Sequence, residues 1–269
     1  MLLSVLSMSN AFSAELTICS FNIQFLGASN IRDHAGLAAT MDQCDIAVIQ
    51  ELIAPPYTGS FPDGKKFNPD PQSTVFFDLM EARGFKYLLS DEDTGPGIKN
   101  QNNSSATEWW AAFYKPNKVT TASELPSGFL SSDRTKNADY ERVPYAFAFR
   151  TPDATLDFVL ISVHLRPGSG NEDKQRRKQE ISSITKWIKD HDQKEKDFII
   201  LGDMNIENTG ELIDFMPTGF ASLNDECIPT NTNKNSPKPY DQIIYSAANT
   251  GSEIDQTFDF KVIDLVKIM

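Results

Sequence analysis

Short apolar segments that end in glycine or polar residues dominate the pattern of this chain. In residues 198–205, the apolar run from Phe198 to Leu201 is followed by Gly202, Asp203, Met204 and Asn205. A short apolar run with isoleucines at its centre predicts a strand buried on both faces. On an extended backbone, residues two apart point to the same side. The segment therefore predicts a buried strand that carries a carboxylate and an amide at its carboxyl end.

Similar patterns predict strands over residues 16–24, 45–52, 85–89, 108–114, 118–125, 144–150, 156–164 and 242–246. Turn-forming residues separate 108–114 from 118–125 and 144–150 from 156–164, so we expect each pair to form a hairpin. Helical periodicity and capping residues predict helices over 30–41 (capped by Asn30), 74–83, 171–191 and 210–216. No repeat or low-complexity linker divides the chain. The pattern predicts one α+β domain in which two β-sheets pack together with helices outside.

The N-terminus has a different character from the rest of the chain. Residues 1–14 combine a short apolar stretch with small residues, and Ala11-Phe12-Ser13 resembles a leader cleavage site. We interpret residues 1–14 as a secretory signal peptide with a clipped start, ahead of a domain over 15–269. The alternative is a disordered or packed extension. A signal peptide predicts a secreted or periplasmic protein. No other stretch approaches the ~20 apolar residues of a membrane span, so we expect no stable membrane anchor.

Charge and cysteine content narrow the choice of partners. The chain has 25 basic and 37 acidic residues, for a formal net charge of −12. Proteins that hold duplex nucleic acid by counterion release carry a basic face, so this balance argues against tight non-specific binding. It does not exclude an enzyme that binds phosphates through a metal ion and a few cationic side chains. We expect such an enzyme to be a monomer. Of the three cysteines, Cys19 and Cys44 could pair if their strands are neighbours, while an odd count leaves one free.

Several predicted strands begin or end in polar residues. Taken singly, each fits a solvated strand end or a hydrogen-bonded structural residue. Together they offer carboxylates for a hard cation, a histidine for proton transfer, and amides and an arginine for phosphate oxygens. The chain has no nucleophile elbow, no P-loop and no G-x-G-x-x-G motif. The chemistry that remains is metal-assisted attack of water on a phosphate ester. The residues that support it, with Asp203 and Asn205, are Asn22, Glu51, Glu108, Arg142, His164 and Asp241.

The order of these motifs along the chain points to a family. The chain shows SFNIQ, VIQEL, TEWWAAFYKP, ERVPYAFAF, ISVHLRP, IILGDMNI and PYDQIIYS in sequence. This series resembles the endonuclease/exonuclease/phosphatase superfamily, and most of all its arm close to pancreatic deoxyribonuclease. The resemblance runs from about residue 16 to the last residue. It implies a four-layered α/β sandwich with two mainly antiparallel sheets flanked by helices, and a metal-dependent phosphodiesterase or phosphomonoesterase. Mg²⁺ is the expected ion, with Mn²⁺ or Ca²⁺ as alternatives.

The resemblance also implies roles for single residues. Glu51 would be the principal metal ligand, with Asn22 beside it. Asp203 would orient or deprotonate the attacking water or hold a second ion, and Asn205 would donate to a phosphate oxygen.

On the other side of the expected site, His164 would hydrogen-bond the phosphate or transfer a proton. Glu108 would orient the His164 ring, and Arg142 would contact the phosphate. Asp241 would orient a second, C-terminal histidine. Family members carry that histidine in a Ser-Asp-His motif, which would begin where this sequence stops at Met269. We therefore expect a chain truncated at its C-terminus and a poor catalyst as given.

Two departures bear on the substrate. DNA-cutting members place an arginine shortly after the metal-ligand glutamate and another soon after the first asparagine, whereas this chain has Leu52 to Ala54 and Gln24 there. We expect a secreted nuclease, with a phosphodiesterase for phospholipids or small phosphate esters as one alternative and a non-catalytic binding module as another. A local cationic rim could come from Lys115, Lys118, Arg166, Lys174, Arg176 and Arg177. For residues 174–178 the alternative, which we favour, is a solvated helix face.

Overall fold

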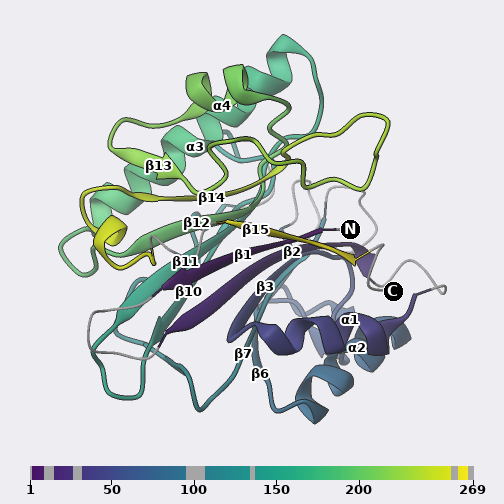
Figure 1. The fold of residues 1–269 in the computed structure, drawn as a ribbon. Helices are drawn as coiled ribbons and strands as arrows, with labels where there is room; N and C mark the ends of the chain where they lie inside the picture. The colour runs from purple at the N-terminus through teal and green to yellow at the C-terminus, as the bar shows by residue number, and fades with distance from the viewer. Residues whose placement is uncertain are drawn as a thin grey trace.

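In a computed structural model of the chain, two β-sheets pack face to face between two layers of helices (Figure 1). The structure describes residues 2–8, 15–26, 32–94, 107–133, 137–255 and 260–265. α1 (His34–Thr40) and α2 (Pro71–Ala82) cover one outer face, and α3 (Asn171–His191) and α4 (Thr209–Phe215) cover the other. Most neighbouring strands are antiparallel. The predicted four-layered α+β sandwich is confirmed.

The first sheet has the strand order β15-β1-β2-β3-β7-β6. Its members are β15 (Lys261–Asp264), β1 (Leu2–Met8), β2 (Leu16–Leu26), β3 (Ile46–Leu52), β7 (Trp109–Tyr114) and β6 (Lys86–Leu89). The segment interpreted as a signal peptide thus includes β1, which pairs with β2 and β15 in this structure. Removal of that segment as a leader stays a prediction.

The second sheet has the strand order β13-β14-β12-β11-β10-β8, with β9 also paired to β10. Its members are β13 (Phe220–Ser222), β14 (Asp241–Ser246), β12 (Phe198–Asp203), β11 (Asp157–His164), β10 (Tyr145–Arg150), β8 (Thr120–Thr121) and β9 (Gly128–Phe129). The small strands β4 (Gly59–Ser60) and β5 (Lys66–Phe67) pair with each other, and short 3₁₀ turns occupy η1 (Met41–Gln43) and η2 (Thr250–Ser252).

The hairpin predictions had mixed outcomes. β10 and β11 pair as predicted. The predicted pairing of 108–114 with 118–125 is wrong, because β7 already has β3 on one side and β6 on the other. Only Thr120–Thr121 of the second segment is a strand, and it pairs with β10.

α2 begins earlier than predicted, because Asp70 caps it and Pro71 fits the first turn. Asp33 caps α1, and Asn30 lies outside the described residues.

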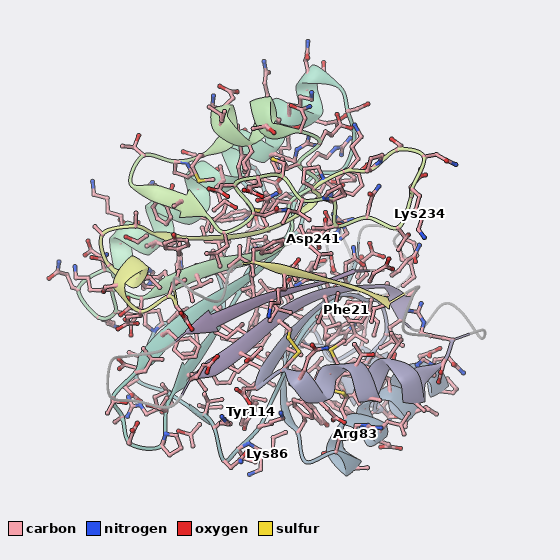
Figure 2. All side chains as sticks on the ribbon, viewed as in Figure 1. Phe21, Arg83, Lys86, Tyr114, Lys234 and Asp241 are labelled. Atoms are coloured by element: carbon pink, nitrogen blue, oxygen red, sulfur yellow. A yellow bond between two sulfur atoms is a disulfide. The ribbon has the colours of Figure 1, made fainter. Side chains whose placement is uncertain are left out.

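Three apolar clusters fill the three spaces between the four layers. One lies between the first sheet and its helices and includes Phe21, which faces that helical layer (Figure 2). A second lies between the other sheet and α3, and a third between the two sheets. Strand alternation explains the partition, since Cys19 and Phe21 belong to the first cluster while Leu16 and Ile18 belong to the inter-sheet one. These clusters fix the strand ends on which the polar residues lie.

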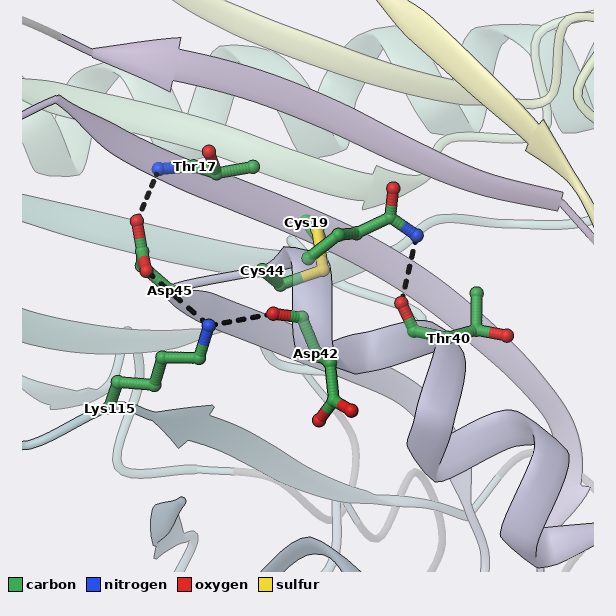
Figure 3. The surroundings of a disulfide bond; sticks show 8 residues. Thr17, Cys19, Thr40, Asp42, Cys44, Asp45 and Lys115 are labelled. Atoms are coloured by element: carbon green, nitrogen blue, oxygen red, sulfur yellow. Dashed lines mark hydrogen bonds and ion pairs between the residues drawn. A yellow bond between two sulfur atoms is a disulfide. The ribbon is translucent and has the colours of Figure 1, made fainter. Parts of the chain in front are cut away.

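A disulfide joins Cys19 of β2 to Cys44, just before β3, with the two Cα atoms 5.9 Å apart (Figure 3). Both cysteines are fully buried. Beside the bridge, Asp45 accepts a hydrogen bond from the backbone N–H of Thr17, and Lys115 lies 3.6 Å from the Asp45 carboxylate. The Cys19–Cys44 disulfide, which the sequence alone could not establish, is therefore present. Cys227 is a free cysteine.

Candidate active site

Each sheet contains one parallel pair of strands, and the candidate site lies where the carboxyl ends of the two pairs meet. β2 and β3 are parallel, with Asn22 beside Gln50. β11 and β12 are parallel, with His164 beside Asp203. A helix connects the strands of each pair, as parallel neighbours require. Parallel strands end at the same edge, so these pairs bring four polar strand ends together.

Strand alternation points several of these side chains into the space between the sheets. On β11, Phe158 and Leu160 belong to the inter-sheet cluster, and Ser162 and His164 continue the same face. A polar rung separates the apolar cluster from the site. Gln50 donates to Ser162 of the opposite sheet at 3.2 Å and accepts from Ser20 at 3.3 Å, and all three side chains are fully buried. This rung ties the two sheets together directly beneath the site.

Glu51 reaches the site only because β3 breaks its alternation. Gln50 points between the sheets, so a regular strand would aim Glu51 at the helices. The backbone of Glu51 instead has φ 60°, in the left-handed region, and the register between β3 and β7 shifts between Ile49 and Leu52. Such a bulge re-aims a side chain, here into the site. Left-handed backbone at a non-glycine residue is strained and tends to occur at functional positions.

Gly202 allows β12 to lie close to β11 at the base of Asp203. Its φ is 142°, and a Cβ added there would lie 2.0 Å from the carbonyl oxygen of Val163. No residue with a side chain fits this close approach. Asp203 itself is pinned at one oxygen, because its Oδ1 accepts the backbone N–H of Asn205 at 2.9 Å.

Asn22 connects the two halves of the site. Its Nδ2 donates to Glu51 at 2.7 Å and to Asp203 at 3.0 Å, while its Oδ1 accepts the backbone N–H of Gln24 at 2.9 Å. The amide therefore places partial positive charge between two carboxylates. To act as the predicted metal ligand, Asn22 would turn its oxygen toward Glu51, a rotation that exchanges two atoms of similar size.

Glu108 is the buried hub on the His164 side. One carboxylate oxygen lies 2.8 Å from Nε of Arg142 and 3.0 Å from Nδ1 of His164, and the other accepts the backbone N–H of Glu51 at 2.6 Å. The predicted contact between Glu108 and the His164 ring is present. Because Nδ1 faces Glu108, Nε2 is the ring nitrogen left for a ligand. Arg142 is buried against Glu108 and also donates to the His164 carbonyl at 3.3 Å, so its phosphate contact stays a prediction.

These contacts decide the pKa shifts of the hub. Burial favours the neutral form of Glu108, but His164, Arg142 and the Glu51 backbone N–H together outweigh it and hold the pKa of Glu108 below its usual value. Burial likewise lowers the pKa of His164, yet the Glu108 carboxylate outweighs it and raises that pKa overall. At Glu51, burial outweighs the His164 charge and the hydrogen bond from Asn22, so the pKa of Glu51 is raised. Glu108 and His164 therefore form an ion pair. A further positive charge beside Glu51 would stabilise its ionised form.

Asp241 and Asn205 complete the set of predicted residues. Asp241 lies beside Asp203 across the antiparallel β12–β14 pair, and burial with the Asp203 charge raises its pKa. Its Oδ1 is buried without a hydrogen-bond partner among the described residues. Figure 2 places Asp241 at the edge between the sheets. Asn205 donates one amide hydrogen to the Leu165 carbonyl at 3.1 Å, which leaves the other for a ligand.

The donor set suits a divalent cation. Single ligand atoms of Glu51, His164 and Asp203 lie within 4.8 Å of one another. Two carboxylates and an imidazole are a donor set for Mg²⁺ or Mn²⁺. The orphaned oxygen of Asp241 and the raised pKa of Glu51 both indicate negative charge without enough positive charge nearby. The residues present therefore fit a metal ion.

A cleft of about 170 Å³ opens onto Glu51, Asp203 and Asp241. Thr230, which sequence analysis missed, lines it and accepts the backbone N–H of Asp241 at 2.9 Å. Sequence analysis also missed the polar rung of Ser20, Gln50 and Ser162, although a glutamine and two serines inside apolar strands were a visible signal. The cleft is lined by Asn22, Gln24, Glu51, Asp203, Thr230, Asn231, Thr232, Tyr240 and Asp241.

The suggested cationic rim is not what the structure contains. Lys115 and Lys118 lie 3.6 and 3.8 Å from Asp45, at the opposite end of β3 from Glu51. The other four cations contact carboxylates or carbonyls of the domain itself: Arg166 with Glu141 and Asp173, Lys174 with Glu207, Arg176 with Ala138, and Arg177 with Glu211. The remaining histidines lie elsewhere, His34 against Gln72 and His191 against the Trp187 carbonyl.

The fold has counterparts among solved structures. No curated protein sequence matches the chain. Among solved structures, an endonuclease/exonuclease/phosphatase family protein from Bacteroides thetaiotaomicron has a TM-score of 0.58 at 16% identity, over 93% of this chain and 96% of that one. The mannosyl-6-phosphatase from B. thetaiotaomicron VPI-5482 has 0.56 at 16%, over 93% and 100%. D. rerio TDP2 complexed with a single-strand DNA product has 0.54 at 14%, over 87% and 84%.

These structural matches share the fold with this chain. The sequence model of the endonuclease/exonuclease/phosphatase family matches residues 19–258, a stretch that contains every site residue named above. By that match, the chain belongs to the endonuclease/exonuclease/phosphatase family.

Proposed function

We propose that this protein is a metal-dependent phosphodiesterase that hydrolyses nucleic acid. The observation that carries the proposal is the convergence of Glu51, His164 and Asp203, from two different sheets, within 4.8 Å. No structural stability is gained by collecting buried carboxylates in one place, since their burial costs free energy unless a cation or donor compensates. We expect Mg²⁺, with Mn²⁺ or Ca²⁺ as alternatives.

Glu51 and Asp203 would hold the ion, with a rotated Asn22 as a further donor. Such an ion supplies Lewis-acid polarisation of a phosphoryl oxygen and neutralises charge that develops on it. Asp203 Oδ1 is held by the Asn205 N–H and Oδ2 accepts from Asn22, so an attacking water would be oriented by a remaining lone pair on one of these oxygens. Asn205 has one amide hydrogen left to donate to a phosphate oxygen.

His164 is prepared for proton transfer or for a phosphate contact. Glu108 fixes the ring through Nδ1 and stabilises the imidazolium, as a buried carboxylate does in other acid–base sites. Arg142 compensates the Glu108 charge, so this carboxylate stays ionised although it is buried. His164 Nε2 is then the ring nitrogen left to donate toward a phosphoryl oxygen or a leaving group.

Two observations bear on substrate and compartment. The fold neighbour TDP2 was solved with a single-strand DNA product, which supports nucleic acid as the substrate class. The Cys19–Cys44 disulfide fits an oxidising compartment, so we propose a secreted or periplasmic protein. Within the described ranges, no helix is long and apolar enough to cross a membrane.

A small phosphate ester is the second candidate substrate. The cleft of about 170 Å³ matches a phosphate with a small attached group, and the walls beyond the carboxylates offer hydroxyl and amide groups from Thr230, Asn231 and Thr232. Such groups suit a sugar as well as a nucleotide.

The deciding experiment combines metal binding with hydrolysis. Calorimetric titration with Mn²⁺ should show binding that Glu51→Gln and Asp203→Asn remove, while Asp153→Asn, in an exposed turn far from the site, binds as the wild type does. The same proteins are then assayed with Mg²⁺ or Mn²⁺ on single-stranded DNA, plasmid DNA, a sugar phosphate and phospholipid vesicles. We expect hydrolysis of nucleic acid that Glu51→Gln reduces at least about 100-fold.

The outcomes separate the candidates. Hydrolysis of the sugar phosphate alone would replace the nuclease proposal with a phosphomonoesterase. Hydrolysis of the vesicles alone would assign phospholipid. Metal binding without any hydrolysis would contradict the catalytic proposal and favour a binding module.

A further inference from the structure

The strand that carries Asn22 continues into an unusual turn at the rim of the site. β2 runs on to Leu26, and both Gln24 and Phe25 have left-handed backbone, with φ of 55° and 58°. A bulky residue in this region is a genuine outlier, because its Cβ crowds the backbone. Two such residues in succession need specific contacts to hold them.

Those contacts come from the site itself. The backbone N–H of Gln24 donates to Asn22 Oδ1 at 2.9 Å, and the N–H of Phe25 donates to Glu51 Oε2 at 3.1 Å. The Arg32 guanidinium donates to the carbonyls of Ile23 and Gln24. The turn is therefore attached to a candidate metal ligand, and its shape follows the shape of the site.

The turn places one phenyl ring in solvent. Phe25 is 48% exposed, whereas Ile23 and Leu26 on either side are buried. Among the described residues, large exposed apolar side chains are few: Phe25, Tyr57, Val75 and Ile213. Of these, only Phe25 has a backbone hydrogen bond to a site residue in the structure as described. A strained backbone that is hydrogen-bonded to Glu51 and exposes an aromatic ring has no folding benefit in what the structure describes.

We propose, on the basis of the function proposed above, that Phe25 is a stacking platform for an unpaired nucleobase next to the phosphate bound at Glu51 and Asp203. A phenyl ring offers no hydrogen bond to a phosphate, but every nucleobase can stack on it. In a duplex, neighbouring bases cover the base faces, so the platform selects single-stranded nucleic acid. Stacking also supplies affinity that this acidic protein, with net charge −12, lacks from phosphate contacts.

The test compares variants of Phe25 on two oligomers of equal length, an oligothymidylate and an abasic oligodeoxynucleotide. Phe25→Ala should lower kcat/KM on oligothymidylate by roughly 5- to 150-fold, mostly through KM, and leave the abasic oligomer unaffected. Phe25→Trp should retain activity, and Phe25→Leu should lose most of it. Ile213→Ala, on exposed α4, is the matched control and should behave as the wild type.

A binding measurement keeps the test independent of turnover. In Phe25→Trp, oligothymidylate should quench the new tryptophan fluorescence, and the abasic oligomer should not. If the wild type cleaves both oligomers and Phe25→Ala matches it on each, the platform is wrong and the nuclease function stands. If the wild type cleaves neither oligomer and no quenching occurs, both proposals are wrong. A loss with Phe25→Ala on sugar phosphates alone would also overturn the nucleobase platform.

Discussion

Asn22 and Asp203 lie 181 residues apart in the chain and on strands of different sheets, yet the Asn22 side chain donates to the Asp203 carboxylate at 3.0 Å. The same Nδ2 donates to Glu51 at 2.7 Å. The Asn22 amide thus partly offsets the negative charge of two carboxylates in the space where the sheets meet. This relationship makes Asn22 the position at which the charge of the site can be changed with the least change in shape.

Asn22→Asp should make folding depend on a divalent cation. The substitution replaces the shared donor with a third carboxylate, and like charges at this distance repel. We expect a lower Tm in EDTA than for the wild type and a larger rise in Tm when Mn²⁺ is added. Asn233→Asp adds the same charge in an exposed loop and should leave the Mn²⁺ response unchanged. An equal Mn²⁺ response in Asn22→Asp and the wild type would contradict this assignment.

Gln50→Leu should weaken both stability and activity by breaking the polar rung between the sheets. It leaves the buried hydroxyls of Ser20 and Ser162 without Gln50, at a cost of about 1–3 kcal/mol in the free energy of unfolding. Because Ser162 and Gln50 lie close in sequence to His164 and Glu51, kcat should fall as well.

The triple variant Gln50→Leu, Ser20→Ala, Ser162→Ala is the control for that prediction. It removes the orphaned hydroxyls together with the glutamine, so chemical denaturation should show much of the stability restored. The activity should stay low, because the hydrogen bonds that join the two sheets beneath the site are lost. A triple variant less stable than Gln50→Leu alone would argue against the rung.

Removal of the Cys19–Cys44 disulfide should destabilise the fold without touching the site. The two cysteines are 25 residues apart, and a loop of this length corresponds to about 3.5 kcal/mol of stabilisation. The double variant Cys19→Ala, Cys44→Ala should therefore have a lower midpoint in urea, and a reducing agent should lower the wild-type midpoint similarly. Cys227→Ala, which removes the free thiol, should leave the midpoint in place. Insensitivity of the wild type to reductant would show that the bridge does not form in solution.

Glu180 predicts a pH dependence of stability. Its buried carboxyl accepts the backbone N–H groups of Glu141 and Arg166, but burial outweighs these bonds and raises its pKa from 4.5 to about 7. Between these values the folded state holds a proton that the unfolded state releases. The free energy of unfolding should therefore fall as pH rises from 4.5 to about 7, by roughly 3 kcal/mol for this group.

Glu180→Gln should flatten that slope in denaturation curves measured across this pH window. Glu172→Gln, at an exposed position in the first turn of the same helix, should preserve the wild-type slope. An unchanged slope in Glu180→Gln would assign the pH dependence to other groups.

Local patterns in the sequence are enough to predict the layers of the fold and to select most residues of the candidate site. Strand alternation separates Phe21 from Ile18 into different cores, and it predicted one α+β domain with two packed sheets. The long helix α3 was predicted to the residue, because its apolar face and its polar flanks are local features. Asn22, His164 and Asp203 could be selected because each ends an apolar strand, a pattern that depends only on neighbours in sequence.

How those residues come together depends on contacts between segments that are distant in the chain. The bulge that turns Glu51 from the helical face into the site depends on the pairing of β3 with β7. The partner of β8 depended on which edges were already occupied, and the cations of the suggested rim depended on which carboxylates lay beside them. The Phe25 turn follows from a hydrogen bond to Glu51, which belongs to another strand. These features arise from contacts between distant segments, and a pattern of local hydrophobicity contains no information about such contacts.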